Sequence, residues 1–407
     1  MISYRLDKKL LFFTLVLVIS WSRTYGGIFL QENEDKPKER MRLIHADELR
    51  GEMFGKQFVR RLIGHVKFKQ GSALVTCREA QEFVDDGKVI FNGNVSFIDQ
   101  SKALYGDRIV YYRSQKLFVA RGNVKLVDST KILTADDLQY FEQDEKAIAD
   151  HHVVLADTSE RMTLTGKHIE YFRNKAYAKV IGQPVFSRLD SLAERKLVIT
   201  GDEMEMFDDG ERVKVMDNVE VKRGEVTANC GALEFFRPED RIALSVEPTA
   251  YRLHDVLFGD KIDLILINNE VREIHVLGQA IVSSKVDTFV QTTTPYDLLT
   301  GEKILVSLKD EQIDTVNVMG RATSFYHVIE DSVEQGINKV LGDDLQMMFL
   351  NGELETVKVE SSPSTSVGNF YPPNSYNQVE NELVTLLTKI GIRSNAPADT
   401  VTSITND

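Results

Sequence analysis

The chain has 407 residues, of which 42% are hydrophobic and 27% are charged, a composition typical of a globular protein rather than a disordered or membrane-embedded one. Its formal net charge of −13 argues against nucleic acid as the partner, because binding phosphates needs a basic surface. With two cysteines, the chain has neither a disulfide-rich scaffold nor a four-cysteine zinc site.

The first 26 residues have the layout of a secretory signal peptide. A positively charged start with Lys8 and Lys9 is followed by the apolar run LLFFTLVLVIS and by small residues up to Gly26. The apolar run is shorter than the roughly 20 residues that a membrane-spanning helix needs, and an uncleaved anchor is the alternative. We therefore predict a signal peptide over residues 1–26, cleaved near Gly26, and a linker over 27–44.

From residue 45 onward the sequence repeats itself. The segments 104–128 and 133–157 begin 29 residues apart, and both contain a small residue, then Asp, then an aromatic pair. A second marker, GNV at 93–95 and 122–124, follows the small residue by 16 positions. A fixed period of this length is the signature of a repeat architecture. The small residues that mark the repeats are Ala46, Cys77, Gly106, Ala135, Gly166, Gly201, Cys230, Gly259, Gly301 and Gly342.

Within each repeat, one set of alternate residues is apolar. Leu138 and Tyr140 share one face and have the polar Gln139 between them. Such alternation predicts half-buried strands, and turn sequences such as DDG at 85–87 and 208–210 separate them. One repeat cannot bury its apolar face alone, whereas stacked repeats can. The sequence therefore predicts an all-β structure in which each repeat is one layer.

The segments YGDRIVYYRSQKLFVARGNVKLVD and TADDLQYFEQDEKAIADHHVVLAD resemble the repeats of the OstA/LptA family. The resemblance is strongest over residues 45–225 and extends to about 360. Members of this family are periplasmic lipopolysaccharide-transport proteins with an open β-jellyroll fold. The resemblance implies an elongated open β-jellyroll of about ten repeats of ~30 residues each.

Only about 45 residues follow the last repeat, too few for the barrel carried by one branch of the family, since each of its eight or more strands needs roughly 10 residues. The resemblance therefore implies the bridge type. The length departs from the short bridge proteins, which have about half as many repeats.

The intervals between repeats divide the chain further. We assign residues 45–290 to OstA-like β-jellyroll repeats and 291–361 to a second β segment of the same type, because the interval lengthens after Gly259. Residues 362–407 form a tail, in which VENELVTLLTKIG has the apolar spacing of a short amphipathic helix. We expect this helix, over residues 378–390, to cap the C-terminal edge of the sheet.

The pattern of the cysteines and of the recurring aspartates favours structural roles for these residues. Cys77 and Cys230 occupy the small-residue position five repeats apart, which favours small buried side chains over a disulfide. Calcium-binding toxin repeats carry the pattern GGxGxD, which is absent, so a role at turns or strand ends is favoured for the aspartates that follow the small residue. These are Asp47, Asp107, Asp136, Asp202, Asp260 and Asp343.

The remaining motif search predicts no catalytic residue, no metal and no cofactor. His151 and His152 are adjacent, so on a strand their side chains point to opposite faces and do not easily share one metal ion. The sequence lacks G-x-S-x-G, H-E-x-x-H and P-loop motifs.

What is left as a candidate site is the apolar face of the repeats. In an open jellyroll, part of this face lines a groove that would take acyl chains by burial, at about 0.8 kcal/mol per CH₂ group. The residues predicted to line the groove are Ile109, Tyr111, Leu138, Tyr140, Ile169, Tyr171, Met204, Leu233, Val124, Val153 and Val219.

The resemblance implies a non-enzymatic, periplasmic bridge or carrier that binds the acyl chains of lipopolysaccharide and takes it between the inner and outer membranes, with the outer membrane as a place of association. The implied partners are other β-jellyroll transport proteins at both membranes, docked by strand addition at the sheet edges, of which residues 42–51 form the N-terminal one. Two alternatives stay open. One is a structural β-repeat scaffold or adhesin, and the other is a β-helix enzyme acting on polysaccharide, which needs a pair of carboxylates.

Overall fold

The computed structural model describes residues 41–189, 196–268, 270–286, 295–310, 312–330, 333–350, 353–362 and 366–391, which all belong to one compact unit, Met41–Asp407. The predicted signal peptide (1–26) and the predicted linker up to residue 40 lie outside the described residues. Within the described ranges, no helix is long and apolar enough to cross a membrane.

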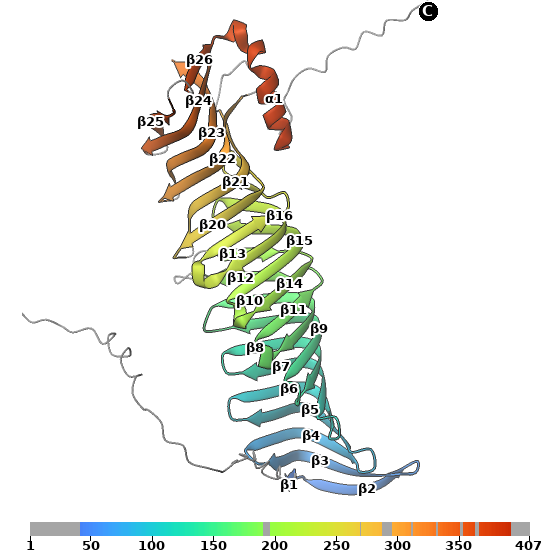
Figure 1. Ribbon diagram of the computed structural model, residues 1–407. Helices are drawn as coiled ribbons and strands as arrows, with labels where there is room; N and C mark the ends of the chain where they lie inside the picture. The colour runs from blue at the N-terminus through green and yellow to red at the C-terminus, as the bar shows by residue number, and fades with distance from the viewer. Residues whose placement is uncertain are drawn as a thin grey trace, which may run out of the picture. The chain divides into compact units, whose positions relative to one another are not determined.

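The unit consists mainly of antiparallel strands stacked in chain order (Figure 1). The long strands are β3 (Gln57–Gln70), β4 (Ala73–Phe83), β5 (Lys88–Asp99), β6 (Lys102–Tyr112), β7 (Leu117–Asp128), β8 (Lys131–Phe141), β9 (Lys146–Asp157), β10 (Met162–Phe172), β15 (Arg212–Arg223), β16 (Val226–Phe236), β21 (Glu270–Lys285), β22 (Tyr296–Lys309), β23 (Gln312–Glu330) and β24 (Val333–Leu350).

Shorter strands, each confined to one side of the stack, complete the ladders. They are β1 (Arg42–His45), β2 (Glu48–Phe54), β11 (Tyr177–Ile181), β12 (Val185–Leu189), β13 (Lys196–Thr200), β14 (Glu203–Phe207), β17 (Arg241–Ser245), β18 (Thr249–Arg252), β19 (Asp255–Phe258), β20 (Lys261–Ile267), β25 (Glu353–Glu360) and β26 (Val367–Tyr371). The helical elements are the 3₁₀ turns η1 (Arg173–Lys175), η2 (Asp208–Gly210), η3 (Arg237–Glu239) and η4 (Pro373–Gln378) and the α-helix α1 (Glu380–Lys389).

Each long strand bends near its middle, so the stack forms two walls. The halves of β5 pair separately with the halves of β6, and the register shifts between Asn92 and Val95. Wall A contains the halves equivalent to Val95–Asp99 of β5, together with β1, β12, β13, β18, β19 and β26. Wall B contains the halves equivalent to Lys88–Asn92, together with β2, β11, β14, β17, β20 and β25.

One of the two motifs at the corner between the walls is a pair of left-handed residues. In β7 these are Gly122 and Asn123, with φ of 70° and 46°. A Cβ atom on Gly122 would lie 2.6 Å from Oδ2 of Asp107, so the first position needs glycine here for space as well as for its backbone. The GNV marker of the sequence is therefore the bend of every second strand.

The small-residue marker is the bend of the strands between them. A Cβ atom on Gly166 would lie 2.3 Å from Cγ1 of Val180 in the core. Cys77 and Cys230 stand at the same position, are 7% and 9% exposed, and are both free. Burial raises the pKa of the Cys77 thiol to about 12 and that of Cys230 to about 11. The prediction of small, buried, unpaired cysteines is confirmed.

The inward faces of the two walls pack into one continuous hydrophobic core that runs from Leu62 in β3 to Met347 in β24. The predicted all-β jellyroll of stacked repeats with one short C-terminal helix is therefore confirmed. The antiparallel ladders also differ from the parallel coils of a β-helix. Pairing of β21 with β22 carries both walls past residue 290, and the predicted division at 290/291 stays a prediction.

Helix α1 lies on the outer face of wall A. Leu383 and Leu387 pack with Ile281 of β21 and Phe325 of β23, which form a second hydrophobic cluster apart from the main core. Ala280, the neighbour of Ile281, belongs to the main core, so Ile281 and the helix face away from the interior.

The prediction that this helix caps the C-terminal sheet edge is wrong. Among the described strands, β25 and β26 each pair with β24 alone, so each keeps an edge without a further strand. A helix with an apolar stripe gains more by covering a flat apolar face than by covering an edge, which presents polar N–H and C=O groups.

Candidate ligand groove between the walls

Most of the residues predicted to line a groove lie in the interior, beside the corner. The apolar residue three positions after the small marker belongs to wall B, and the valine of the GNV-type marker belongs to wall A. All of these side chains are 0–2% exposed and form part of the main core: Ile109, Leu138, Ile169, Met204, Leu233, Val124, Val153 and Val219. They form one apolar floor shared by successive repeats.

The three predicted tyrosines lie on wall B farther from the corner, toward the side where the free ends of the two walls face each other, which we call the mouth. Tyr171 is 8% exposed, and Tyr111 and Tyr140 are partly buried against the core. Burial raises the pKa of all three phenols, so they remain neutral at physiological pH. The positive charge of Lys131 on wall A opposes this rise in the pKa of Tyr171.

Aromatic rings of the two walls meet in the N-terminal part of the interior. The ring of Phe97 on wall A is 5.0 Å from that of Phe91 and 5.1 Å from that of Phe118, both on wall B, in edge-to-face geometry. Phe118 also stacks on Tyr111 at 4.4 Å between centroids. Phe97 and Phe118 are only partly buried, unlike Phe91. We name Phe68, Phe91, Phe97, Tyr111 and Phe118 the aromatic section.

Sequence reasoning missed the phenylalanines of this section. Their signal is nevertheless regular, because Phe68 and Phe97 each lie two positions after the valine of a GNV-type marker and so point into the interior as that valine does. The equivalent residue in the next repeat is Leu126, which packs against the same core.

Ion pairs bridge the mouth over the middle of the molecule. Each joins a residue at the free end of wall A to one at a turn of wall B, and the two partners are far apart in sequence. Five such pairs are Lys102–Glu145 (3.9 Å), Asp128–Arg173, Lys131–Asp209, Arg188–Asp240 (3.3 Å) and Glu160–Arg237 (2.7 Å). We call them the mouth ion pairs.

The electrostatics of Lys131 reflect its place at the mouth. Burial alone would lower the pKa of Lys131, but its hydrogen bond to Asp209 and the carboxylate charges of Asp209 and Asp157 outweigh burial and keep that pKa above its ordinary value. The lysine is therefore charged at any physiological pH, and the pair with Asp209 persists as an ion pair.

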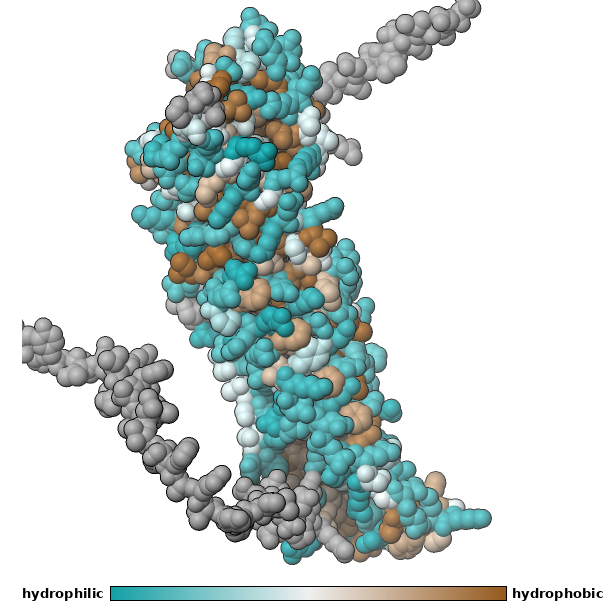
Figure 2. Space-filling model, viewed as in Figure 1, coloured by the Kyte–Doolittle hydropathy of each residue, from teal (hydrophilic) through white to brown (hydrophobic). Residues whose placement is uncertain are grey.

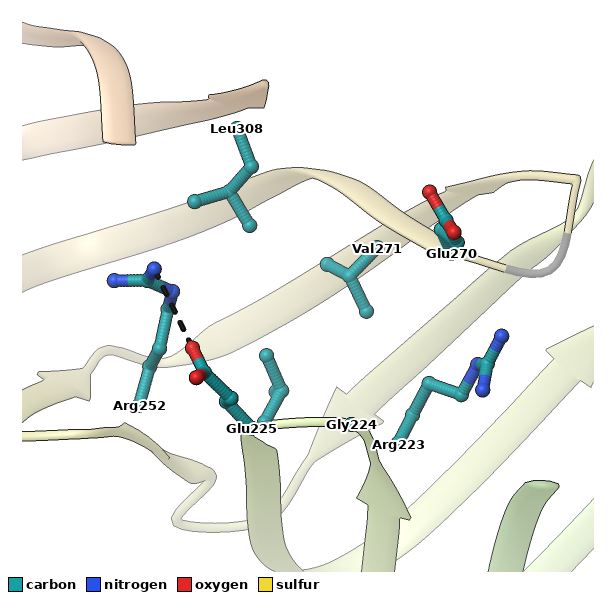
Figure 3. Close-up of a pocket in the computed structure, with 8 residues that line it drawn as sticks. Arg223, Gly224, Glu225, Arg252, Glu270, Val271 and Leu308 are labelled. Atoms are coloured by element: carbon teal, nitrogen blue, oxygen red, sulfur yellow. Dashed lines mark ion pairs between the residues drawn. The ribbon is translucent and has the colours of Figure 1, made fainter. Parts of the chain in front are cut away.

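A small cavity lies at the mouth beyond these pairs. It measures about 30 Å³ and is lined by Arg223, Glu225 and Arg252 of wall A and by Glu270 and Leu308 of wall B, among others. Figure 3 shows the guanidinium of Arg252 facing the carboxylate of Glu225, with which it forms an ion pair of 3.6 Å. Both arginines are more than nine-tenths buried. The cavity has room for water but not for an acyl chain.

Aspartates of the sequence repeat accept hydrogen bonds that link neighbouring strands at the corner. Asp107 accepts a hydrogen bond from Asn123 at 2.8 Å, and Asp202 accepts one from Asn218 at 2.7 Å. Asp136 does the same with His152 at 2.8 Å, while His151 lies 3.5 Å from a different carboxylate. The predicted place at turns or strand ends holds for Asp47, Asp202 and Asp260, which lie between two strands. It is wrong for Asp107, Asp136 and Asp343, which lie inside β6, β8 and β24 because these strands continue through the corner. Within the described part of the chain, no group of His, Cys, Asp and Glu has the arrangement of a metal site.

Both ends of the stack expose apolar side chains on edge strands. On β2, Met53 and Phe54 are 66% and 74% exposed, and on β26 Phe370 is 53% exposed. Among the described strands, β1 and β2 pair with β3 alone, so residues 42–51 form an edge as predicted. Elsewhere, the face seen in Figure 2 is mostly hydrophilic, with hydrophobic residues gathered over β20 and β21.

Comparison with known proteins agrees with these repeats. The model of the family described as OstA-like protein matches residues 38–178 and 81–222. A solved structure, LptH from Pseudomonas aeruginosa, described as the LptA-homologous periplasmic component of the lipopolysaccharide transport device, is 16% identical. The similarity to LptH covers 34% of this chain and 96% of LptH, with a TM-score of 0.24. No curated protein matches the chain. The repeats over residues 38–222 are therefore OstA-like.

Proposed function

We propose that this protein is a periplasmic carrier or bridge that binds lipopolysaccharide by its acyl chains and carries it between the inner and outer membranes. One observation supports this more than any other. In the described ranges the chain crosses from one wall to the other at the corner, and the apolar interior between the walls runs from β3 to β24. A sheet folded in this way can receive an apolar chain by parting its walls at the mouth.

The energetics suit a carrier without catalytic groups. Burying a 12-carbon acyl chain gains about 10 kcal/mol before the cost of parting the walls is subtracted. That cost is the loss of contacts between the walls, which the acyl chain replaces with similar apolar contacts. The polar head group stays at the mouth in water, so only the acyl chains need a place in the interior.

The floor of the interior allows movement along the stack. Successive repeats place chemically similar side chains at the same depth, such as Ile109, Leu138 and Ile169, so a bound chain meets a similar surface in each layer. When sites in a row have nearly equal affinity, no single layer holds the chain more strongly than the next. The interior therefore suits transport along the stack better than tight binding at one place.

The exposed edges suit docking to other β-jellyroll transport proteins at the two membranes. Strand addition to an open edge supplies main-chain hydrogen bonds, and the exposed Met53 and Phe54 of β2 would be buried by an added strand. A docked jellyroll would continue both walls and the interior between them.

Lipid content of the gently purified protein tests this proposal. Mass spectrometry of the extract is expected to show lipopolysaccharide, and added lipopolysaccharide is expected to bind while its polysaccharide part, freed of acyl chains, does not. Binding of the polysaccharide alone would contradict a site for acyl chains. Absence of both bound and bindable lipid would favour a structural scaffold.

A further inference from the structure

Two places in the interior bring an aromatic ring of wall A against one of wall B. In the aromatic section, Phe97 meets Phe118 at 5.1 Å between ring centroids, and both rings are partly exposed. Farther along, Phe186 of β12 meets Phe235 of β16 at 6.1 Å, and these rings are 1% and 0% exposed. The same kind of contact between the walls is thus accessible at one place and sealed at the other.

The mouth ion pairs lie over one of these two places and beyond the other. Of the mouth ion pairs, Lys102–Glu145 is the nearest to the N-terminus. It lies beyond the aromatic section on both walls, because Lys102 follows the strand of Phe97 and Glu145 follows the strand of Phe118. The pairs Glu160–Arg237 and Arg188–Asp240 lie over the section that holds Phe186 and Phe235. Charged side chains across the mouth hold the walls together there and place a charged barrier between solvent and the apolar interior.

We infer that acyl chains enter between the walls at the aromatic section, and that the mouth ion pairs exclude them from direct entry over the middle of the molecule. This inference rests on the proposed function, because it assigns the entrance of the same interior. An acyl chain at the entrance replaces edge-to-face contacts of Phe97 and Phe118, which are partly exposed and so the least costly part of the core to displace. A chain entering at Phe186 would first have to part ion pairs.

The mouth ion pairs have the properties of a latch that ionic strength controls. Their side chains are partly exposed, as with Glu160 at 44% and Arg237 at 18%, so dissolved salt screens their attraction. In contrast, the apolar contacts between the walls strengthen or stay unchanged in salt. High salt is therefore expected to widen access to the middle section without weakening the walls themselves.

Photo-crosslinking of the full-length protein tests the entrance. p-Benzoylphenylalanine replaces Phe118 in one variant and Phe186 in another, and each is irradiated shortly after addition of purified lipopolysaccharide. We expect capture of lipid at position 118 and little at position 186. Equal early capture at both positions would overturn the inference. No capture at either position, nor by mass spectrometry, would instead count against the proposed function.

Substitutions that reverse charges in the mouth ion pairs test whether these pairs block entry of acyl chains, the action that we call the latch. In the Phe186 variant, Glu160→Lys with Lys131→Glu places like charges across the mouth at two pairs and is expected to raise capture by roughly threefold to tenfold. In a separate variant that keeps Lys131, the exchange Glu160→Arg with Arg237→Glu preserves the attraction with the charges reversed and should leave capture at its starting level. The matched control Glu220→Lys removes an ion pair with Lys222 that lies along one strand of wall A, and should change nothing.

A second measurement covers the case in which a charge variant folds poorly. Capture at position 186 in the otherwise unchanged protein is compared at low salt and in 1 M NaCl, where the Debye length is about 3 Å. We expect capture to rise with salt at position 186 and to stay level at position 118. Capture at position 186 that responds neither to salt nor to the charge variants would overturn the latch.

Discussion

Asn123 donates a hydrogen bond of 2.8 Å from Nδ2 to Oδ2 of Asp107, and this bond joins the two repeated markers of the sequence. Asp107 follows the small residue of one strand, and Asn123 is the second left-handed residue of the next strand. The bond recurs as Asp202–Asn218, so these two repeats each carry both halves of a corner. The corner sets the two walls against each other and thereby creates the interior.

Packing at this corner can be tested by adding one methyl group. Gly122→Ala is expected to destabilise the protein by about 1–3 kcal/mol, because the new Cβ meets Asp107 and because φ of 70° disfavours a side chain. Gly71→Ala is the control, since Gly71 has a φ of 60° but no atom within 4 Å of its Cβ position. Thermal unfolding followed by circular dichroism should show the larger loss for Gly122→Ala, and equal losses would contradict close packing of Asp107.

Much of this fold could be predicted from the sequence because its causes are local. Alternation around Leu138 and Tyr140 specifies strands with one buried face, and the period of the markers specifies their stacking. The interior location of Ile109 and its equivalents follows from the same alternation. Whether that interior binds lipid depends on how the walls part, which alternation does not encode.

The mouth ion pairs and the position of helix α1 could not be predicted, because they depend on contacts between residues far apart in the sequence. Lys131 and Asp209 are 78 positions apart, and they meet only because the walls twist past each other across the mouth. Nothing in the local sequence of either residue indicates the other. Likewise, Ile281 and Phe325 occupy outward positions, and the sequence alone does not show that a helix covers them rather than an edge.

Shortening a side chain in the interior should destabilise the protein more than shortening one on the outer face. Leu138→Ala is expected to cost about 2–5 kcal/mol, because Leu138 is 2% exposed and its neighbours cannot close the cavity fully. The adjacent Gln139→Ala is the control, because this exposed side chain points to the outer face and its loss should stay within about 0.5 kcal/mol. Urea unfolding measures both, and similar losses would contradict the assignment of faces.

Helix α1 should stabilise wall A locally. Leu387→Ala is expected to loosen the helix and to speed hydrogen exchange in β22, β23 and β24, because Leu387 is fully buried against Leu298 and Phe325. Thr385→Ala on the exposed side of the helix is the control. Hydrogen exchange with mass spectrometry reads out the two variants. Unchanged protection in Leu387→Ala would show that the helix does not hold this part of the wall.

The two cysteines should not react with thiol reagents in the folded protein. Their contribution to stability should be lost at alkaline pH. Their pKa values in the fold, about 12 and about 11, exceed the ordinary value of 9.0, so the folded state favours the neutral thiols. Their contribution to stability is full below pH 9 and is lost as pH rises through these folded-state values. Native protein should therefore not react with a thiol reagent at pH 8, whereas unfolded protein should.

The control for this pH dependence is the variant Cys77→Ala with Cys230→Ala, since alanine occupies the same repeat position at Ala46 and Ala135. Its stability should fall less between pH 9 and pH 11 than that of the unchanged protein. Rapid labelling of the native cysteines at pH 8 would contradict their burial.

Placement of acyl chains between the walls is tested most directly by two neighbouring residues of β5. Phe97 points into the interior, and Ile98 points outward and is 39% exposed. With a photo-crosslinker at each position in turn, lipopolysaccharide is expected to be captured at 97 and not at 98. Capture at 98 alone, or equally at both positions, would contradict a site between the walls.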